Sequence, residues 1–234
     1  MITTRVKWVS LFICITYILI QSFQWWVFSH APQEENPVAE FLFDATPLSV
    51  IRSWLMLLAM FGLMYVHAVI SMTFSATARI ASFVAIGSFF TFFLLEVALR
   101  AVELFHIQIQ LPIEYVSATE QAKDGIIAYV TRLRQIQMAL YFPLGMSLMI
   151  GSFMIGAFVP SDRKLNWLVK AAFYFNALRI LLRSATTYFG LNLFPGTLYN
   201  SLYLPMVVVV FGLSALYFLT LQERPERLQS TTSY

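Results

Sequence analysis

The sequence predicts an all-α, polytopic integral membrane protein with six transmembrane helices, and its composition and apolar blocks lead to that prediction. Of the 234 residues, 59% are hydrophobic and 12% are charged, whereas soluble domains carry about 45–50% apolar and about 25% charged residues. The apolar residues occur in blocks of about twenty or more, which is the length that crosses a bilayer core of about 30 Å. The net charge of +3 is too small to indicate nucleic acid as a partner.

Six apolar stretches account for most of the chain, and each is long enough to cross the bilayer with some tilt. A helix of about 22 to 25 residues, the length of each stretch, measures about 33–37 Å. The stretches cover residues 6–28, 49–72, 82–104, 137–159, 167–190 and 197–221. The first is expected to be retained, because its apolar core exceeds that of a secretory signal and Pro32 follows the small-residue site at Ala31.

Basic residues predict the orientation of these spans. Eight of them fall on one side: Arg5, Lys7, Arg79, Arg163, Lys164, Lys170, Arg224 and Arg227. Four fall on the other side: Arg52, Lys123, Arg132 and Arg134. Since cytoplasmic loops carry the excess of Lys and Arg, both termini are expected in the cytoplasm. A plasma membrane, most simply a bacterial inner membrane, is the expected location.

The segment 105–136 between the third and fourth stretches is predicted to be an extracytoplasmic helical projection. Ser117-Ala118-Thr119-Glu120 fits a capping box, which satisfies free amides at a helix start. Apolar residues then recur at helical spacing at Ile126, Ile127, Val130 and Leu133. We expect one continuous helix from near Thr119 into the membrane; the alternative is a separate helix lying on the outer surface. Residues 1–221 would form one domain, and 222–234 a polar cytoplasmic tail.

Small residues on the fourth stretch predict a close helix–helix approach. Ser147 with Gly151, and Ser152 with Gly156, are pairs four residues apart. In membrane helices this spacing lets two backbones approach closely.

Ionisable residues inside two of the spans are the candidate functional site. On the third stretch, Glu96, Arg100, Glu103, His106 and Gln110 share one stripe at about 100° per residue. On the fifth, the corresponding stripe holds Asn176, Arg179, Arg183 and Thr187. The stripes overlap in the outer half of the membrane, so Glu96 is expected to meet Arg179, and Arg183 to meet Glu103. This predicts that the two helices are neighbours.

Two interpretations of this cluster stay open. Because a charge at the bilayer centre costs at least about 2.5–3.5 kcal/mol, the five charged residues must face one another or a water-filled cavity. The cluster could be a buried ion-pair network that fixes helix packing. It could also be a site, since three arginines against two glutamates favour a carboxylate or phosphate.

The leading functional hypothesis is therefore binding or passage of a small anionic solute or lipid head group, at a site formed by Glu96, Arg100, Glu103, Asn176, Arg179 and Arg183. One alternative is a non-catalytic membrane subunit or assembly factor that docks a protein partner through its extracytoplasmic helices; a homodimer is also compatible. The second alternative is a membrane enzyme acting on lipid, although no motif names a reaction.

No cofactor or metal is expected. His67 and His106 are predicted to lie about 30 Å apart in depth, so they cannot share one haem iron or zinc. Cys14 lies alone among apolar residues of the first stretch, where it is expected to pack as a small apolar side chain.

Overall fold

The computed structural model describes residues 3–32, 36–160, 165–191 and 196–221, with the backbone alone for 196–201. All secondary structure in these ranges is helical. The elements are α1 (Thr4–Phe28), α2 (Pro37–Asp44), α3 (Pro47–Thr73), α4 (Arg79–Ala101), the π-helix η1 (Val102–Gln110), α5 (Leu111–Ser117), α6 (Glu120–Phe158), α7 (Asn166–Tyr188) and α8 (Gly196–Thr220). The predicted cytoplasmic residues Arg163, Lys164, Arg224 and Arg227 and the tail 222–234 lie outside the described residues.

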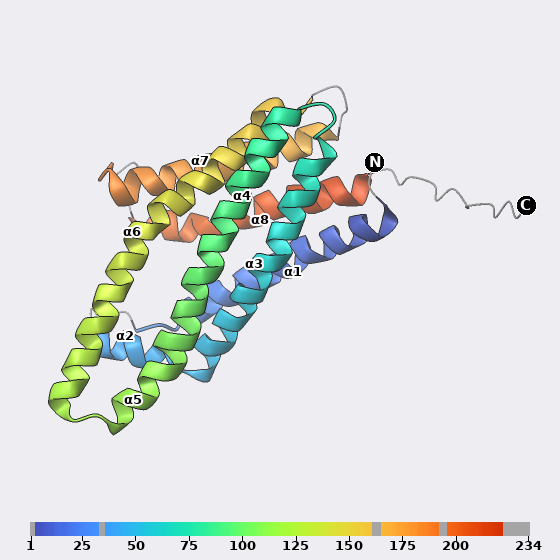
Figure 1. The fold of residues 1–234 in the computed structure, drawn as a ribbon. Coiled ribbons are helices and arrows are strands. Elements are labelled where there is room, and N and C mark those ends of the chain that lie inside the picture. Colours follow the sequence, from blue (N-terminus) through green and yellow to red (C-terminus); the bar gives the residue numbers. More distant parts are fainter. Residues whose placement is uncertain (1–2, 33–35, 161–164, 192–195, 222–234) are drawn as a thin grey trace, which may run out of the picture.

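The six long helices pack side by side in a closed ring. Neighbouring pairs around the ring are α1–α3, α3–α4, α4–α6, α6–α7, α7–α8 and α8–α1. The start of α1 and the end of α8 lie at the same end of the bundle, as Figure 1 shows. The chain is thus an all-α bundle whose ring encloses a central space.

Within the described ranges, five helical segments are long and apolar enough to cross a membrane, which fits a multi-pass membrane protein. They are α1, α3, the continuous rod Arg79–Ser117, α6 and the Leu202–Thr220 part of α8. The sixth ring member, α7, is not among them, and it carries Lys170, Arg179 and Arg183.

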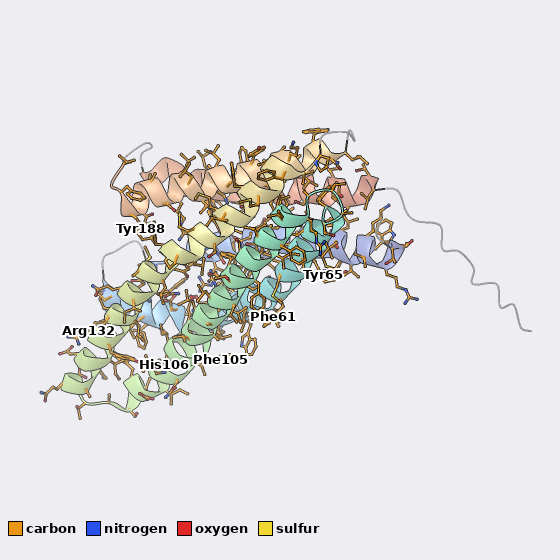
Figure 2. All side chains as sticks on the ribbon, turned by 45° about the horizontal axis from the view of Figure 1, so that its top comes forward. Phe61, Tyr65, Phe105, His106, Arg132 and Tyr188 are labelled. Carbon is orange, nitrogen blue, oxygen red and sulfur yellow. The ribbon has the colours of Figure 1, made fainter. Side chains whose placement is uncertain are left out.

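The outer surface of the ring is apolar, which fits a lipid environment. Every ring helix carries apolar side chains that are about half exposed or more. They include Phe12, Leu19, Leu58, Phe61, Phe83, Phe90, Phe153, Leu181 and Leu216. Figure 2 labels Phe61 and Phe105 on the outer faces of α3 and η1. Many of the buried polar residues, by contrast, lie toward the interior, so the ring is arranged as an integral membrane protein requires.

The small residues of α6 allow the close approaches that the sequence predicts. A Cβ added to Gly151 would lie 2.6 Å from a ring carbon of Phe89 on α4. At Gly156, an added Cβ would lie 3.1 Å from the ring of Tyr174 on α7. The α6 helix therefore packs tightly between α4 and α7 because it carries glycine at these two contacts.

The helix α6 begins where the sequence predicts but is capped differently. It runs without a break from Glu120 to Phe158, and Thr119 is its N-cap residue. The predicted capping box is wrong, because the Ser117 hydroxyl donates to the carbonyls of Ile113 and Glu114 in the preceding helix. Ser117 still completes α5, and it lies two residues before Thr119, the N-cap residue of α6.

The first turns of α6 pack against α2, η1 and α5, at the lower left of Figure 1. Phe41 of α2 is fully buried, together with Ile107, Leu111 and Val130. The rest of the predicted stripe, Ile126, Ile127 and Leu133, packs against these four residues. The apolar stripe is thus covered by the chain's own α2, η1 and α5.

Candidate functional site

The polar stripe of the third span continues through the π-helix η1, which changes the residues that face inward. In a π-helix, residues five apart rather than four apart fall in line. Accordingly, Gln108 is buried and donates to Glu103 Oε1 at 3.5 Å. His106 and Gln110 turn outward, and His106 bonds to Gln110 and Tyr129. Their predicted place on the inward stripe is wrong, since that prediction used α-helical spacing beyond Ala101.

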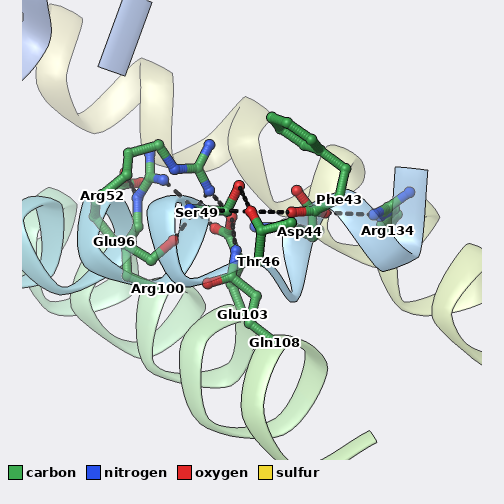
Figure 3. A network of polar contacts seen from close by, with 12 residues as sticks. Phe43, Asp44, Thr46, Ser49, Arg52, Glu96, Arg100, Glu103, Gln108 and Arg134 are labelled. Atoms are coloured by element: carbon green, nitrogen blue, oxygen red, sulfur yellow. Dashed lines mark hydrogen bonds and ion pairs between the residues drawn. The ribbon is translucent and has the colours of Figure 1, made fainter. Parts of the chain in front are cut away.

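Two arginines and two glutamates, Arg52, Glu96, Arg100 and Glu103, form what we call the α3–α4 network, shown in Figure 3. Arg100 Nε donates to Glu96 Oε1 at 3.0 Å, and Arg100 Nη1 reaches Glu103 Oε2 at 3.4 Å. Arg52 Nη2 donates to Glu103 Oε1 at 3.1 Å and to Ser53 Oγ at 3.0 Å. With two cations and two anions, this network is electrically neutral.

Arg52 was missed by sequence reasoning, which assigned it to the outer side as an orientation signal. Its side chain is 2% exposed and lies on α3, one turn inside the helix start. The signal was present in the spacing, because Ser49, Arg52 and Ser53 are three and four residues apart and fall on one face. A polar face at the beginning of an apolar span indicates contact with another helix.

A second group of charges ties α2 to α6. Arg134 of α6 donates from Nη1 to Glu40 Oε2 at 2.7 Å and from Nη2 to Asp44 Oδ2 at 2.6 Å. Burial raises the pKa of the Asp44 carboxyl above its ordinary value, against the opposing attraction of Arg134 and Arg52. We call this group the α2 latch; Figure 3 shows it beside the α3–α4 network.

The polar residues of α7 are held differently from those of α4. Asn176 donates to Ser152 Oγ of α6 at 2.8 Å and accepts from Arg179 Nη2 at 3.1 Å. The guanidinium of Arg179 lies 5.4 Å from the ring centre of Tyr203. Arg183 lies 5.5 Å from the ring centre of Tyr141. Both α7 arginines therefore rest near aromatic rings, as a cation–π contact requires.

The predicted pairs between the two spans do not form. Across the described residues, no ion pair joins Glu96 to Arg179 or Glu103 to Arg183. The reason is the order of the helices in the ring, since α6 packs between α4 and α7. Thr187, the last member of the predicted α7 stripe, is exposed.

The inward residues of both spans line one central cavity of about 110 Å³, which has room for several water molecules. Its polar lining includes Gln21, Glu96, Arg100, Tyr141, Asn176, Arg179, Arg183, Tyr188 and Tyr203. Its apolar lining includes Met56, Met60, Leu63, Phe93, Leu148 and Phe211. The cavity thus brings all of the predicted site residues together except Glu103, which is not part of the lining and pairs with Arg100.

Two polar atoms of cavity-lining residues are buried without a hydrogen-bond partner. They are Arg179 Nε, a donor, and Gln21 Oε1, an acceptor. Buried polar atoms are nearly always paired with protein or with water. Arg52 Nε of the α3–α4 network is also buried without a described partner, so this feature does not distinguish the cavity from that network.

The charge of the cavity lining is unbalanced. Within the described ranges, neither Arg179 nor Arg183 has a carboxylate within 4.0 Å, whereas Arg52 and Arg100 do. The α7 arginines therefore bring two positive charges that the described residues do not neutralise. In a low-dielectric interior, such charges attract an anion far more strongly than they would in water.

His67 lines the cavity, whereas His106 does not. His67 is buried, bonds through Nδ1 to the Leu63 carbonyl at 2.8 Å, and contacts four phenylalanine rings. No three side chains of His, Cys, Asp or Glu converge as a metal site in the part of the chain that the structure describes. Cys14 is fully buried in the apolar core.

Comparison of the chain with protein-family models, with curated proteins and with solved structures finds no match.

Proposed function

We propose that this protein binds a small anion in the central cavity of a membrane-embedded helical ring, and that Arg179 and Arg183 hold it. The observation that carries the proposal is the pair of cavity-lining guanidinium groups without a described carboxylate partner.

The contrast with the α3–α4 network strengthens the proposal. The same fold neutralises Arg52 and Arg100 with carboxylates at 3.0–3.4 Å. A charge within the bilayer costs at least about 2.5–3.5 kcal/mol, so leaving two of them without a carboxylate needs a compensating role. Binding an anionic ligand supplies that role, because the ligand completes the missing ion pairs.

The residues around the arginines suit such a ligand. A guanidinium presents a planar fork of donors that matches a carboxylate or phosphate. The rings of Tyr203 and Tyr141 lie beside Arg179 and Arg183, which restricts the orientation of both forks. Asn176 accepts a hydrogen bond from Nη2 of Arg179. Before ligand entry, water in the cavity would solvate the two cations.

The membrane arrangement completes the proposal. We infer that α7 is the sixth span, because its outer face exposes Phe175, Leu178 and Leu181 while its charges point into the ring. The excess of basic residues then favours cytoplasmic termini and a binding site in the outer half of the bilayer. A bacterial inner membrane is the location that we propose.

The apolar surface that would favour docking of a protein partner is covered by other parts of the same chain. The stripe Ile126, Ile127, Val130 and Leu133 packs against Phe41 and its neighbours within the chain. The cavity, in contrast, stays available to a ligand. Anion binding is therefore the function that we carry forward.

The direct test is calorimetric titration of the protein, in bilayer nanodiscs of zwitterionic lipid, with inorganic phosphate and with acetate. We expect binding of at least one of them, and a loss of about tenfold or more in affinity for Arg179→Gln and for Arg183→Gln. Arg132→Gln is the matched control, since it removes an exposed arginine from the α6 projection (Figure 2). Equal affinity in all four proteins would contradict the proposal.

A further inference from the structure

The polarity of the central cavity changes along its length, and this bears on what kind of anion it accepts. On α7, the lining runs from Asn176 to Tyr188, a distance of about 18 Å at 1.5 Å per residue. The Tyr188 end of the cavity also holds Arg100, Tyr141 and Arg183. This end is charged and hydroxyl-rich.

Beyond Asn176, in the direction of His67, the lining of the cavity is apolar. This part includes Leu63, Phe93, Leu148 and Phe211, next to His67. Apolar surface of this kind is not needed to bind phosphate or acetate, whose charge would be desolvated there at a cost. It does favour an alkyl or aryl group on the same ligand, because burial of apolar surface stabilises by about 25 cal/mol per Å².

From this gradient we propose that the ligand is an amphipathic anion with a single short apolar chain. This inference rests on the proposed function and specifies its ligand class. The carboxylate or phosphate group lies between Arg179 and Arg183, and the chain points toward His67. Glu96 does not oppose this placement, since its carboxylate is paired with Arg100 at 3.0 Å.

The apolar end is closed, which limits the length of the chain. The His67 ring lies 4.6 Å from the Phe89 ring centre, 5.2 Å from that of Phe93 and 5.6 Å from that of Phe173. Together with the volume of about 110 Å³, this wall leaves no path for two long acyl chains. The ligand is therefore a soluble single-chain anion rather than a membrane phospholipid.

The test is a chain-length series measured by calorimetric titration in zwitterionic nanodiscs. The probes are inorganic phosphate and the methyl, butyl and hexyl monophosphates, with alkyl trimethylammonium ions of the same lengths as controls. We expect affinity to rise about fourfold per methylene until the apolar end is filled. The ammonium series is expected not to bind at the arginines. In Leu63→Phe or Leu148→Phe, the dependence of affinity on chain length is expected to be lost.

Each other outcome has a definite meaning. If phosphate binds and the alkyl phosphates bind no better, the chain is not recognised and this inference is overturned, while the proposed function stands. If the ammonium series binds equally well, the cavity recognises apolar surface alone, and this inference fails. If neither acetate nor any phosphate, alkylated or not, binds, the proposed function fails with it. Tighter binding of phosphatidic acid, supplied in the nanodisc, than of hexyl phosphate would assign the site to a lipid head group instead.

Discussion

The two sides of the polar interior hold arginine in opposite ways. Between α3 and α4, Arg52 and Arg100 are matched by Glu103 and Glu96 within 3.4 Å. On α7, Arg179 and Arg183 contact an amide and aromatic rings but no described carboxylate. A closed, neutral network fits a packing role, and an open, cationic one fits a ligand. We therefore propose that one buried charge cluster combines both interpretations that the sequence left open.

The largest expected effect is in the α3–α4 network. Glu103→Gln should lower the free energy of unfolding by about 3–5 kcal/mol, because it removes the carboxylate that neutralises a fully buried Arg52. The measurement is reversible unfolding in detergent. Glu120→Gln is the matched control, since Glu120 is 89% exposed in its pair with Lys123.

Substitution of both Arg52 and Glu103 tests that prediction more specifically. In an Arg52→Met background, Glu103→Gln should cost much less, since the Arg52 guanidinium is absent and Arg100 keeps its shorter ion pair with Glu96. If the two substitutions simply add, the Arg52–Glu103 pair is not what holds α3 against α4, and the account of this network is wrong.

The α2 latch should give a smaller effect. Arg134→Gln removes both ion pairs to α2, but its side chain is 25% exposed. Ion pairs in contact with water contribute about 1 kcal/mol or less, and salt weakens them. We expect a small drop in melting temperature that shrinks at high salt. A drop as large as that of Glu103→Gln would mean that the latch, and not the buried network, sets the stability.

The smallest expected effect is the pH dependence of Asp44. Its pKa is raised in the folded protein above the ordinary value of 3.8, so the folded state binds a proton more tightly than the unfolded state. The contribution of Asp44 to stability therefore increases as pH falls through the raised pKa and levels off below 3.8. The measurement is the difference in unfolding free energy between the parent and Asp44→Asn across this range. The opposite slope would show that attraction by Arg134 outweighs burial.

Sequence reasoning predicted the elements of this fold better than their arrangement. The apolar stretch at 49–72 corresponds to α3, at Pro47–Thr73, because length and composition are local properties of a membrane helix. A close helix contact at Gly151 was also predictable, since small residues mark close packing, although its partner α4 was not. Helical periodicity, however, indicates which face of a helix points inward but not which helix packs beside it. The insertion of α6 between α4 and α7 therefore could not be foreseen.

Two features of the site were not predicted from the sequence, and each has a physical reason. The π-helix η1 shifts the inward face from His106 and Gln110 to Gln108, and periodicity at α-helical spacing carries no sign of this shift. Arg52 was interpreted as a loop charge because it is near the end of its span. Its carboxylate partner, Glu103, is 51 positions away in the sequence. Partners at such separation become visible only once the helices are packed.

The measurement that most directly tests the account is the same substitution made in both regions, Arg52→Gln and Arg179→Gln, followed by unfolding in detergent without added anions. Arg52→Gln should lower the unfolding free energy by about 3–5 kcal/mol, since it breaks a buried ion pair. Arg179→Gln should stay within about 1 kcal/mol of the parent or melt higher, because removal of an uncompensated charge offsets the lost hydrogen bond to Asn176. Equal, large losses in both proteins would contradict the account and make the whole cluster a packing network.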